Sequence, residues 1–347
     1  MIGRRVPRLF KLTAGVGGIL ALFLFVMDRN LDTRLGPLIY YKSIIIRQQT
    51  SASPEPYSST TTLSSDEVND DNGAQRFIDR KEVQTRMCQE LNLGGKIKTK
   101  EFMYYNRRHK LLVCAPPKTG CSSIKRHLLQ LAEIKGKFQV HSRKARKAIA
   151  AKQVLGKYLN KVLKSPSPAT RVMVARHPLD RLVSGYREKF KNGAPVSGMW
   201  GNYLKKYRKS RGFDIRNRTL PFPDFLEMIA YKMETKGRNS LDRHFRPTSL
   251  LCSPCSVQYD YIFHTDTLTE DLKYIVDEYN ITGINIYARM NSKVKKSKGL
   301  TYEDYYKDVP LSLISRIYAL FKEDFLVYGF KLLPSMLSVL QNATETS

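Results

Sequence analysis

Two segments of the chain place phosphate-binding residue types directly after a short apolar run. In the first, residues 111–115 (LLVCA) predict a buried strand, two prolines end it, and residues 118–123 (KTGCSS) lead into a predicted helix. A strand, tight loop and helix in this order point backbone N–H groups at a phosphate. Gly120 permits close approach of the backbone, and Lys118 adds a positive charge. The predicted ligand contacts of this loop are Pro117, Lys118, Thr119, Gly120, Cys121, Ser122 and Ser123.

The second segment begins with another predicted strand, residues 171–175 (RVMVA), which Arg176 follows at once. Pro178 suits the start of a helix, and Ser184 lies about two turns into it. The arginine fork and the serine hydroxyl could therefore bind one phosphate. The predicted contacts of this segment are Arg176, His177, Pro178, Leu179, Asp180, Arg181, Leu182, Val183 and Ser184.

Each segment alone has an ordinary alternative: a plain strand-to-helix turn, or an amphipathic helix with solvated arginines. The first loop also differs from that of nucleoside triphosphatases, which has two glycines and a Lys directly before Ser or Thr. Together, the two strand-end elements lie roughly 60 residues apart in a basic chain. One nucleotide with phosphates at both its 5′ and 3′ positions would use both elements, which predicts 3′-phosphoadenosine-5′-phosphosulfate (PAPS) as the ligand.

These motifs resemble those of the membrane-bound carbohydrate sulfotransferases. APPKTGCSSIKR is similar to their 5′-phosphosulfate loop, and ARHPLDRLVSGYREKF is similar to their 3′-phosphate element. LDRHFRPTSLLCSPCSVQYDYIF and YYKDVPLSLISRIYALFKEDFLVYGF resemble later segments of the branch with the chondroitin and dermatan 4-O-sulfotransferases and the human natural killer epitope sulfotransferase. The resemblance covers residues 110–330 and is interrupted at 191–240. Phe245 stands in place of the usual Trp, and His177 in place of the usual Glu.

The resemblance implies PAPS-dependent O-sulfation of a glycan without a metal, for example at O4 of N-acetylgalactosamine in chondroitin or dermatan. It also implies that His244 is the general base and that Lys118 stabilises charge on the departing nucleotide. Judged by its neighbours alone, His244 would be a surface histidine. An N-glycan or glucuronyl acceptor is the alternative substrate.

The alternation of predicted strands and helices indicates an α/β fold. We expect a P-loop-like sulfotransferase domain at residues 86–335, with a central parallel sheet flanked by helices and the cofactor at the carboxyl ends of the strands. A C-terminal tail follows at 336–347. Residues 28–85 are expected to form a disordered luminal stem, because the Ser-, Thr-, Asp- and Asn-rich stretch at 47–75 holds almost no apolar residues.

An uncharged apolar run at residues 12–27 (LTAGVGGILALFLFVM) follows a basic tail at residues 1–11. This pattern predicts a single membrane-spanning anchor with a cytosolic N-terminus, short enough for the thinner membranes of the early secretory pathway. A cleaved signal peptide is the rival, although no small-residue cleavage site follows promptly. Three N-glycosylation acceptors, Asn217, Asn280 and Asn342, agree with a type II Golgi protein whose catalytic domain is luminal.

The 347-residue chain carries a net charge of +28, from 59 Lys and Arg against 31 Asp and Glu. Such a field favours an anionic partner, and nucleic acid, anionic lipid, acidic glycan and a polyphosphate cofactor all qualify. The resemblance selects the last two over nucleic acid. Basic clusters at residues 143–164 and 205–211 could bind an acidic glycan or form solvated faces. The single C-x-x-C pair argues against zinc, and in an oxidising lumen some of Cys88, Cys252 and Cys255 could pair.

Two other functions compete with sulfuryl transfer. A luminal nucleotide kinase would need the G-x-x-x-x-G-K-[ST] motif, which the sequence lacks. A non-catalytic, membrane-anchored glycosaminoglycan-binding protein would explain the charge but not the two phosphate elements. Labelling of glycans that depends on PAPS distinguishes the three.

Overall fold

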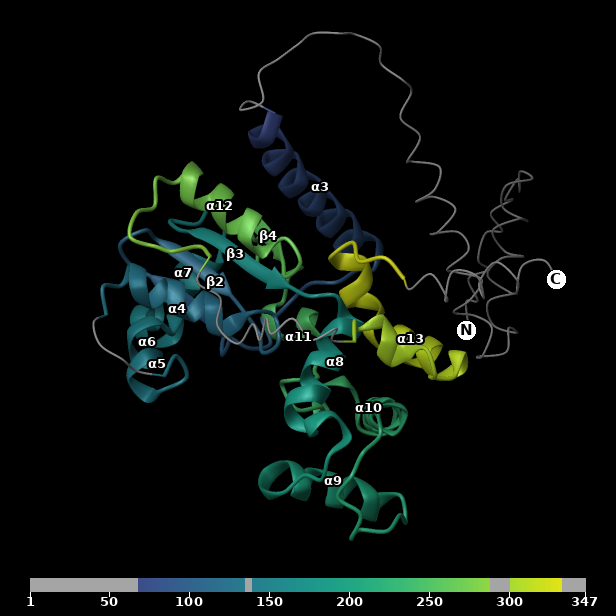
Figure 1. The fold of residues 1–347 in the computed structure, drawn as a ribbon. Helices are drawn as coiled ribbons and strands as arrows, with labels where there is room; N and C mark the ends of the chain where they lie inside the picture. Colours follow the sequence, from purple (N-terminus) through teal and green to yellow (C-terminus); the bar gives the residue numbers. More distant parts are fainter. Residues whose placement is uncertain (1–67, 135–138, 288–299, 333–347) are drawn as a thin grey trace, which may run out of the picture. The chain divides into compact units, whose positions relative to one another are not determined.

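The chain folds around a four-stranded sheet with flanking helices (Figure 1). The computed structural model describes residues 68–134, 139–287 and 300–332. In spatial order the strands are β1 (Met103–Asn106), β2 (Leu111–Cys114), β3 (Thr170–Ala175) and β4 (Tyr261–His264). The predicted α/β class is confirmed. The predicted parallel arrangement holds for β2, β3 and β4, whereas β1, which was not predicted, returns as a hairpin antiparallel to β2.

The parallel strands are apolar along their whole length because both faces of the sheet are covered. Val113 pairs in register with Val172, and both join the core beneath α4 and α12. The alternate residues Leu112 and Met173 are completely buried as well. Strands covered on both faces read as continuous apolar runs, which is why the two runs were visible in the sequence.

Helices connect the strands and cover the sheet. They are α3 (Val68–Glu90), α4 (Cys121–Leu131), α5 (Arg143–Ile149), α6 (Ala151–Leu155), α7 (Leu159–Leu163), α8 (Pro178–Lys189), α9 (Gly198–Ser210), α10 (Phe222–Lys236), α11 (Thr248–Cys252), α12 (Leu268–Glu278) and α13 (Leu311–Val327). The predicted helix after each phosphate segment is present, as α4 and α8.

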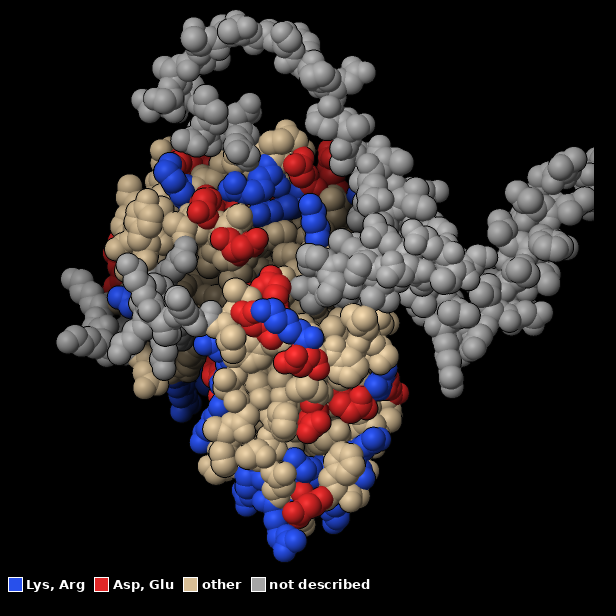
Figure 2. All heavy atoms as spheres, turned by 45° about the vertical axis from the view of Figure 1, so that its right-hand side comes forward, with Lys and Arg blue, Asp and Glu red and all other residues tan. Residues whose placement is uncertain are grey.

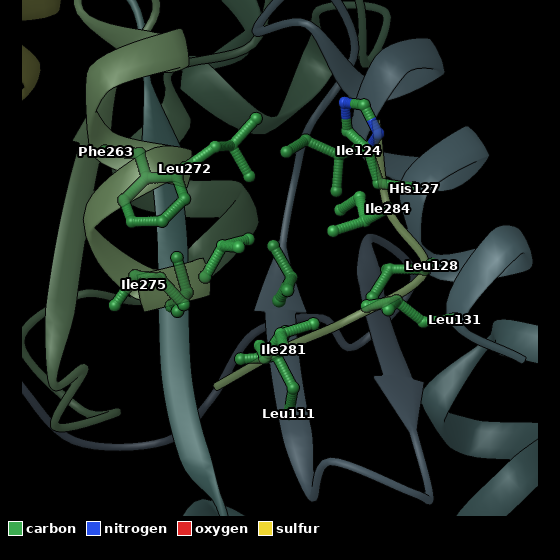
Figure 3. Close-up of a pocket in the computed structure, with 13 residues that line it drawn as sticks. Leu111, Ile124, His127, Leu128, Leu131, Phe263, Leu272, Ile275, Ile281 and Ile284 are labelled. Atoms are coloured by element: carbon green, nitrogen blue, oxygen red, sulfur yellow. The ribbon is translucent and has the colours of Figure 1, made fainter. Parts of the chain in front are cut away.

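The core between α4, α12 and the sheet encloses an apolar cavity of about 30 Å³ (Figure 3). Its lining includes Leu111, Ile124 and Ile275, and His127 is its one side chain with an ionisable group. Burial lowers the pKa of His127 below its ordinary value, so this imidazole is neutral at neutral pH. The cavity is a packing feature with no polar group arranged for chemistry.

Helix α3 begins inside the segment that was expected to be a disordered stem. Phe77 is 5% exposed and packs edge-on against Tyr261 of β4 at 5.1 Å between ring centroids. Arg80 donates from Nη1 to a carboxylate oxygen of Asp271 in α12 at 2.8 Å. The predicted boundary at residue 85 is therefore wrong, because residues from 68 onward already belong to the folded domain.

Two disulfides attach distant segments to the region of α11. Cys88 of α3 is bonded to Cys255, and Cys114 of β2 is bonded to Cys252. Cys114, which lies inside a predicted apolar strand, was not among the cysteines expected to pair. The remaining cysteine, Cys121, is free.

The predicted anchor at residues 12–27 and the sequon at Asn342 lie outside the described residues. Within residues 68–134, 139–287 and 300–332, no helix has the length and apolar character needed to cross a membrane.

Candidate active site

A cavity of about 1010 Å³ opens where β2 and β3 end. Because these strands are parallel neighbours, the segments that follow them emerge at the same edge of the sheet. The predicted site residues that line the cavity are Pro117, Lys118, Gly120, Cys121, Ser122, Arg176, Asp180, Val183, Ser184 and His244. The structure thus brings both phosphate segments and the predicted base to one cavity.

The hydroxyl group of Thr119 stabilises the first phosphate loop by bonding to the backbone of the same loop. Oγ1 of Thr119 donates to the carbonyl of Pro116 at 2.9 Å, and the buried Thr119 does not line the cavity. Gly120 has φ 78°, a left-handed value that favours glycine, and it caps the N-terminus of α4. The first helical residues, Cys121 and Ser122, line the cavity, so the N-terminus of α4 faces it. A helix N-terminus suits an anion.

Arg176 joins the second phosphate segment to the first. Its Nε and Nη2 each donate to a carboxylate oxygen of Asp180 at 2.7 Å, and its Nη1 donates to the carbonyl of Lys118 at 3.0 Å. A guanidinium has five N–H groups, so one remains on each of Nη1 and Nη2. Ser184 lines the same cavity from α8. Arg176 and Ser184 therefore line the same cavity.

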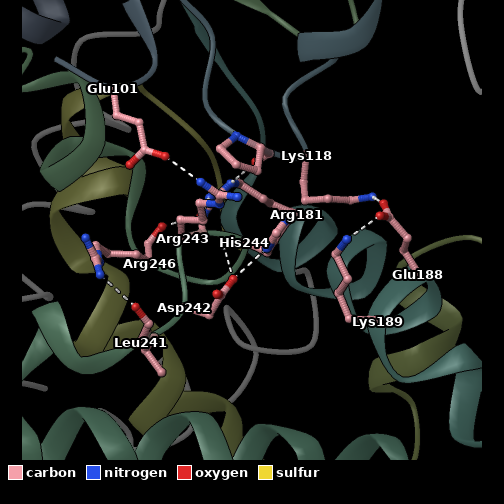
Figure 4. Close-up of polar contacts among 11 residues, drawn as sticks. Glu101, Lys118, Arg181, Glu188, Lys189, Leu241, Asp242, Arg243, His244 and Arg246 are labelled. Atoms are coloured by element: carbon pink, nitrogen blue, oxygen red, sulfur yellow. Dashed lines mark hydrogen bonds and ion pairs between the residues drawn. The ribbon is translucent and has the colours of Figure 1, made fainter. Parts of the chain in front are cut away.

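Lys118 forms an ion pair with Glu188 of α8, and Glu188 also pairs with Lys189 (Figure 4). Partial burial favours the neutral form of Glu188, but the hydrogen bonds and charges of the two lysines outweigh it and lower its pKa to about 2. Glu188 is therefore ionised at neutral pH and holds the ammonium group of Lys118 at the cavity wall. A phosphate or sulfate group at Lys118 would compete with this carboxylate.

Arg181 was predicted to contact the cofactor, but it is 2% exposed and does not line the cavity. Its nitrogens donate to the backbone carbonyls of Pro117 at 3.0 Å, Arg246 at 2.6 Å and Arg243 at 3.1 Å (Figure 4). Burial lowers the pKa of Arg181 to about 10, which still leaves it charged at neutral pH. Arg181 thus ties the first phosphate loop to the segment that carries His244.

The segment that carries His244 is held by buried contacts on both of its sides. Asp324 of α13 accepts hydrogen bonds from the first two backbone N–H groups of α11, at 2.5 and 2.8 Å. Phe245 is completely buried against α8, and a Cβ added at Gly185 would lie 2.6 Å from its ring. The phenylalanine at this position therefore belongs to the core and not to the cavity lining.

His244 is oriented by Asp242. The Oδ1 atom of Asp242 lies 2.5 Å from Nδ1 of the imidazole and accepts the backbone N–H of His244 at 2.9 Å. The imidazole packs edge-on against Trp200 at 5.8 Å between ring centroids. Burial raises the pKa of Asp242, but the hydrogen bonds from His244 outweigh it and lower the pKa below its ordinary value. An ionised carboxylate only accepts, so Nδ1 carries the hydrogen and Nε2 is left as the basic nitrogen.

Three polar side chains of the cavity region were not predicted from the sequence as part of the site. Asp242 lies two residues before His244, a spacing at which an Asp side chain often bonds to the backbone, and this turn signal could have identified it. Glu188 stands within the second motif, but its pairing with Lys118 depends on the fold. His141 has no motif, and the fold alone brings its Nε2 to 2.9 Å from Oγ of Ser122.

Some predicted contacts of the second segment build that segment without lining the cavity. Pro178, Leu179 and Leu182 form the buried face of α8. The Nε2 atom of His177 lies 3.0 Å from the carbonyl of Lys331. In the first loop, Ser123 is 7% exposed and likewise lies outside the cavity lining.

The basic clusters differ in their relation to the cavity. From residues 143–164, Arg146 lines it. Residues 205–211 belong to α9 and its end, and Figure 2 shows lysine and arginine side chains gathered at this lower end of the domain. Within this cluster, Arg208 donates to the carbonyl of Thr219 at 2.9 Å, so part of the charge has a structural role.

The charges of the cavity lining suit an anionic ligand. Six cationic side chains line it: Lys118, Lys125, Arg146, Arg176, Arg187 and Arg243. Three carboxylates line it: Glu101, Asp180 and Glu188. In the part of the chain that the structure describes, no group of three or more His, Cys, Asp or Glu side chains is placed to hold a metal ion. The lining therefore provides hydrogen-bond donors of the kind that bind phosphate and sulfate oxygens.

Comparison with known proteins agrees with the motifs that line the cavity. A sequence model of the sulfotransferase family matches residues 102–331, which contain both phosphate segments and His244. Carbohydrate sulfotransferase 10 of Danio rerio is 26% identical over 245 residues, 64% of this chain and 64% of that protein. Carbohydrate sulfotransferase 9 of Homo sapiens is 26% identical over 243 residues, 66% of this chain and 53% of that protein. Carbohydrate sulfotransferase 8 of Mus musculus is 26% identical over 242 residues, 66% of this chain and 56% of that protein.

The chain thus spans between about half and two thirds of the length of these curated relatives. No solved structure matches it significantly.

Proposed function

The chain belongs to the sulfotransferase family, and from that membership we propose that it transfers a sulfuryl group from PAPS to a hydroxyl group of a glycan. Sulfotransferases use PAPS as the sulfate donor. The observation that carries the proposal is the position of the phosphate elements. The two elements follow neighbouring parallel strands and line one cavity together with His244.

The side chains of the cavity suit the charged groups of PAPS. Lys118 and Ser122, with the N-terminus of α4, would hold the 5′-phosphosulfate. The free N–H groups of Arg176 and the hydroxyl of Ser184 would hold the 3′-phosphate. Gly120 keeps the loop free of a Cβ at the point where the backbone turns toward the ligand.

In the proposed reaction, a lone pair of the acceptor hydroxyl attacks the sulfur of PAPS. A new O–S bond forms while the bond between sulfur and the bridging oxygen of the 5′-phosphate breaks, and its electron pair leaves with 3′-phosphoadenosine-5′-phosphate (PAP). The hydroxyl proton passes to Nε2 of His244, whose Nδ1–H remains bonded to Asp242. Lys118 stabilises the negative charge on the departing phosphate oxygen.

The acceptor we propose is a glycan of the chondroitin or dermatan type, sulfated at O4 of N-acetylgalactosamine. The relatives' names, which describe carbohydrate sulfotransferases, and the cationic cavity support a glycan acceptor. An N-glycan or a glucuronyl group is the alternative acceptor. The basic end of the domain at α9 favours a second candidate function, non-catalytic binding of a glycosaminoglycan.

We also propose that the protein is anchored in the Golgi membrane with this domain in the lumen. Two disulfides support an oxidising compartment. The sequon residues Asn217 and Asn280 are both exposed, as glycosylation requires. Treatment of the expressed protein with an N-glycosidase should increase its gel mobility. No shift, together with protease access to the domain in sealed vesicles, would overturn the topology.

The activity is tested with labelled PAPS and a panel of glycans, followed by digestion to map the sulfated position. We expect label in a glycan with the wild-type protein and a loss of labelling when Lys118 and Arg176 are both changed to Ala. Binding of glycosaminoglycan without transfer from PAPS to any glycan would instead favour the non-catalytic function.

A further inference from the structure

The cavity contains positive charge that its own carboxylates do not neutralise. Each of its three carboxylates forms an ion pair with a cation of the same cavity: Lys118 with Glu188, Arg176 with Asp180, and Arg243 with Glu101. Among the described residues, Lys125, Arg146 and Arg187 have no carboxylate within ion-pair distance. Arg187 lies in the motif of the second phosphate segment. Lys125 lies in the motif of the first, two residues after its last predicted contact, Ser123, whereas Arg146 belongs to neither.

Lys125 is held in a fixed place on the second turn of α4. Its Nζ lies 3.1 Å from Nδ1 of His141 and 4.9 Å from the ring centroid of Tyr104. Burial lowers the pKa of Lys125, and the charges of Arg243 and Arg146 lower it further. Lys125 of α4, Arg146 of α5 and Arg243 of the loop before α11 all line the same cavity.

The orientation of His141 connects this cluster to the phosphate loop. A lysine ammonium group can only donate, so Nδ1 of His141 accepts from Lys125. The hydrogen of the neutral ring is then on Nε2, which donates to Oγ of Ser122 at 2.9 Å. Burial and the charge of Lys125 lower the pKa of His141, which agrees with a neutral ring. The cluster therefore lies directly beside the predicted site of the phosphosulfate.

The cluster is also next to the predicted base, because Arg243 directly precedes His244 and both line the cavity. The volume of about 1010 Å³ lies at the upper limit of the roughly 300–1,000 Å³ typical of a pocket for one small ligand. The two phosphate elements already supply donors for the charged groups of the nucleotide. The cavity thus has room and unused positive charge for part of a second, anionic substrate.

We propose that Lys125, Arg146 and Arg243 form an acceptor subsite for a negatively charged group that neighbours the reacting hydroxyl. The group would be the carboxylate of a hexuronate or a sulfate ester already present on the glycan, because both are oxygen anions that Arg and Lys bind. This inference rests on the proposed function and narrows its substrate to an acidic glycan.

The test compares Arg146→Gln with Lys147→Gln, which removes the neighbouring charge of α5 but does not line the cavity. The acceptors are unsulfated chondroitin oligosaccharide, its carboxyl-reduced form, and a carboxyl-reduced form that bears a sulfate ester. We expect Arg146→Gln to raise KM for an acidic acceptor about 10-fold or more with little change in kcat, because one charge-assisted contact is lost. The increase should be much smaller for the neutral acceptor and for Lys147→Gln.

The two acidic acceptors identify the anion. A penalty confined to unsulfated chondroitin assigns the subsite to the carboxylate, and a penalty confined to the sulfated form assigns it to the ester. An equal penalty for the neutral acceptor would overturn the subsite. A loss of PAP affinity as large as the increase in KM would also overturn it, because the cluster would then belong to the nucleotide.

A direct measurement of glycan binding tests the subsite independently of sulfate transfer. Calorimetry in the presence of PAP should show that Arg146→Gln binds chondroitin hexasaccharide about 10-fold or more weakly than wild type. If wild type transfers no sulfate but this difference in binding is present, the proposed function fails and the subsite stands. If Arg146→Gln and wild type bind the hexasaccharide equally well, the subsite is wrong.

Discussion

The Oδ1 atom of Asp242 accepts hydrogen bonds from two groups of His244, the imidazole Nδ1 at 2.5 Å and the backbone N–H at 2.9 Å. The two contacts fix both the position of the ring and the hydrogen on Nδ1, because the carboxylate can only accept. Since Asp242 touches the imidazole and does not line the cavity, we regard it as a positioning residue. Its effect on the reaction passes through the basicity and direction of Nε2.

Asp242→Asn should therefore slow turnover while the affinity for PAP remains close to that of wild type. The amide can present an N–H to Nδ1 and favour the wrong tautomer of His244. A fully buried pair of this kind can cost about 10⁴-fold in kcat, and we expect at least about 10-fold here because Asp242 is only partly buried. The measurement is kcat for sulfate transfer at saturating PAPS and acceptor.

The control for Asp242→Asn is Asp277→Asn, which removes an exposed carboxylate that pairs with Lys273 on α12. This control should keep the turnover of wild type. Equal turnover of Asp242→Asn and wild type would show that Asp242 does not position the base.

Lys118→Ala and Arg176→Ala should each weaken PAP binding. Each substitution removes a charged contact to a phosphate, worth about 1.5–3 kcal/mol. Calorimetric titration of the folded variants with PAP measures the loss. Lys164→Ala, which removes a lysine that does not line the cavity, should leave the affinity unchanged. Wild-type affinity in both cavity variants would rule out the site with two phosphate elements.

Arg181→Met should destabilise the fold, because it removes the donor to three backbone carbonyls. An acceptor left without a partner in a buried place costs about 1–3 kcal/mol, so we expect a loss of at least about 2 kcal/mol in the free energy of unfolding. Arg187→Met on the exposed side of the same helix should change it by about 0.5 kcal/mol or less. Denaturant unfolding measures both, and equal stability of the two variants would contradict the role of Arg181 as a clamp.

Because of His264, the free energy of unfolding should decrease as the pH falls below neutral. Burial, with the charges of Arg80 and Arg76, lowers its pKa to about 3, whereas an unfolded histidine titrates near 6.5. Between these values the unfolded state binds more protons, so the folded state loses stability as the pH falls below about 6.5. One such group contributes a slope of up to about 1.4 kcal/mol per pH unit.

His264→Gln should reduce that slope between pH 6 and pH 5, whatever its effect on stability at pH 7. The measurement is the free energy of unfolding in denaturant at each pH. His141→Gln should reduce the slope less, because His141 is more exposed than His264, so burial lowers its pKa less. A variant slope equal to that of wild type would mean that His264 is protonated in the folded protein.

The parts of the site that follow the strands were predictable from sequence. Strands buried on both faces leave continuous apolar runs, and the loops after β2 and β3 keep their polar residues close along the chain. Contacts between distant segments were not predictable. Arg181 reaches the carbonyl of Arg246 across 65 positions, and His141 reaches Ser122 across 19. No local pattern encodes either pairing.

The errors in the fold also concern features that leave no clear local pattern in the sequence. Helix α3 has a polar sequence, and its place in the domain depends on contacts such as that between Arg80 and Asp271, which are 191 positions apart. Its few buried apolar residues, among them Phe77 and Met87, form too weak a pattern to distinguish a docked helix from a polar stem. In β1, four consecutive buried residues leave no alternation from which its antiparallel pairing could be read.

The central claim is that the cavity between the two phosphate elements transfers sulfate with His244 as the base. The most direct measurement is kcat of His244→Ala at saturating PAPS and acceptor, taken with the PAP affinity of the same protein. General base catalysis contributes about 10²–10⁴-fold, so turnover should fall by roughly that factor while PAP affinity stays near that of wild type. A folded variant that keeps more than about a third of wild-type turnover would contradict the claim, because such a loss is far below what a general base supplies.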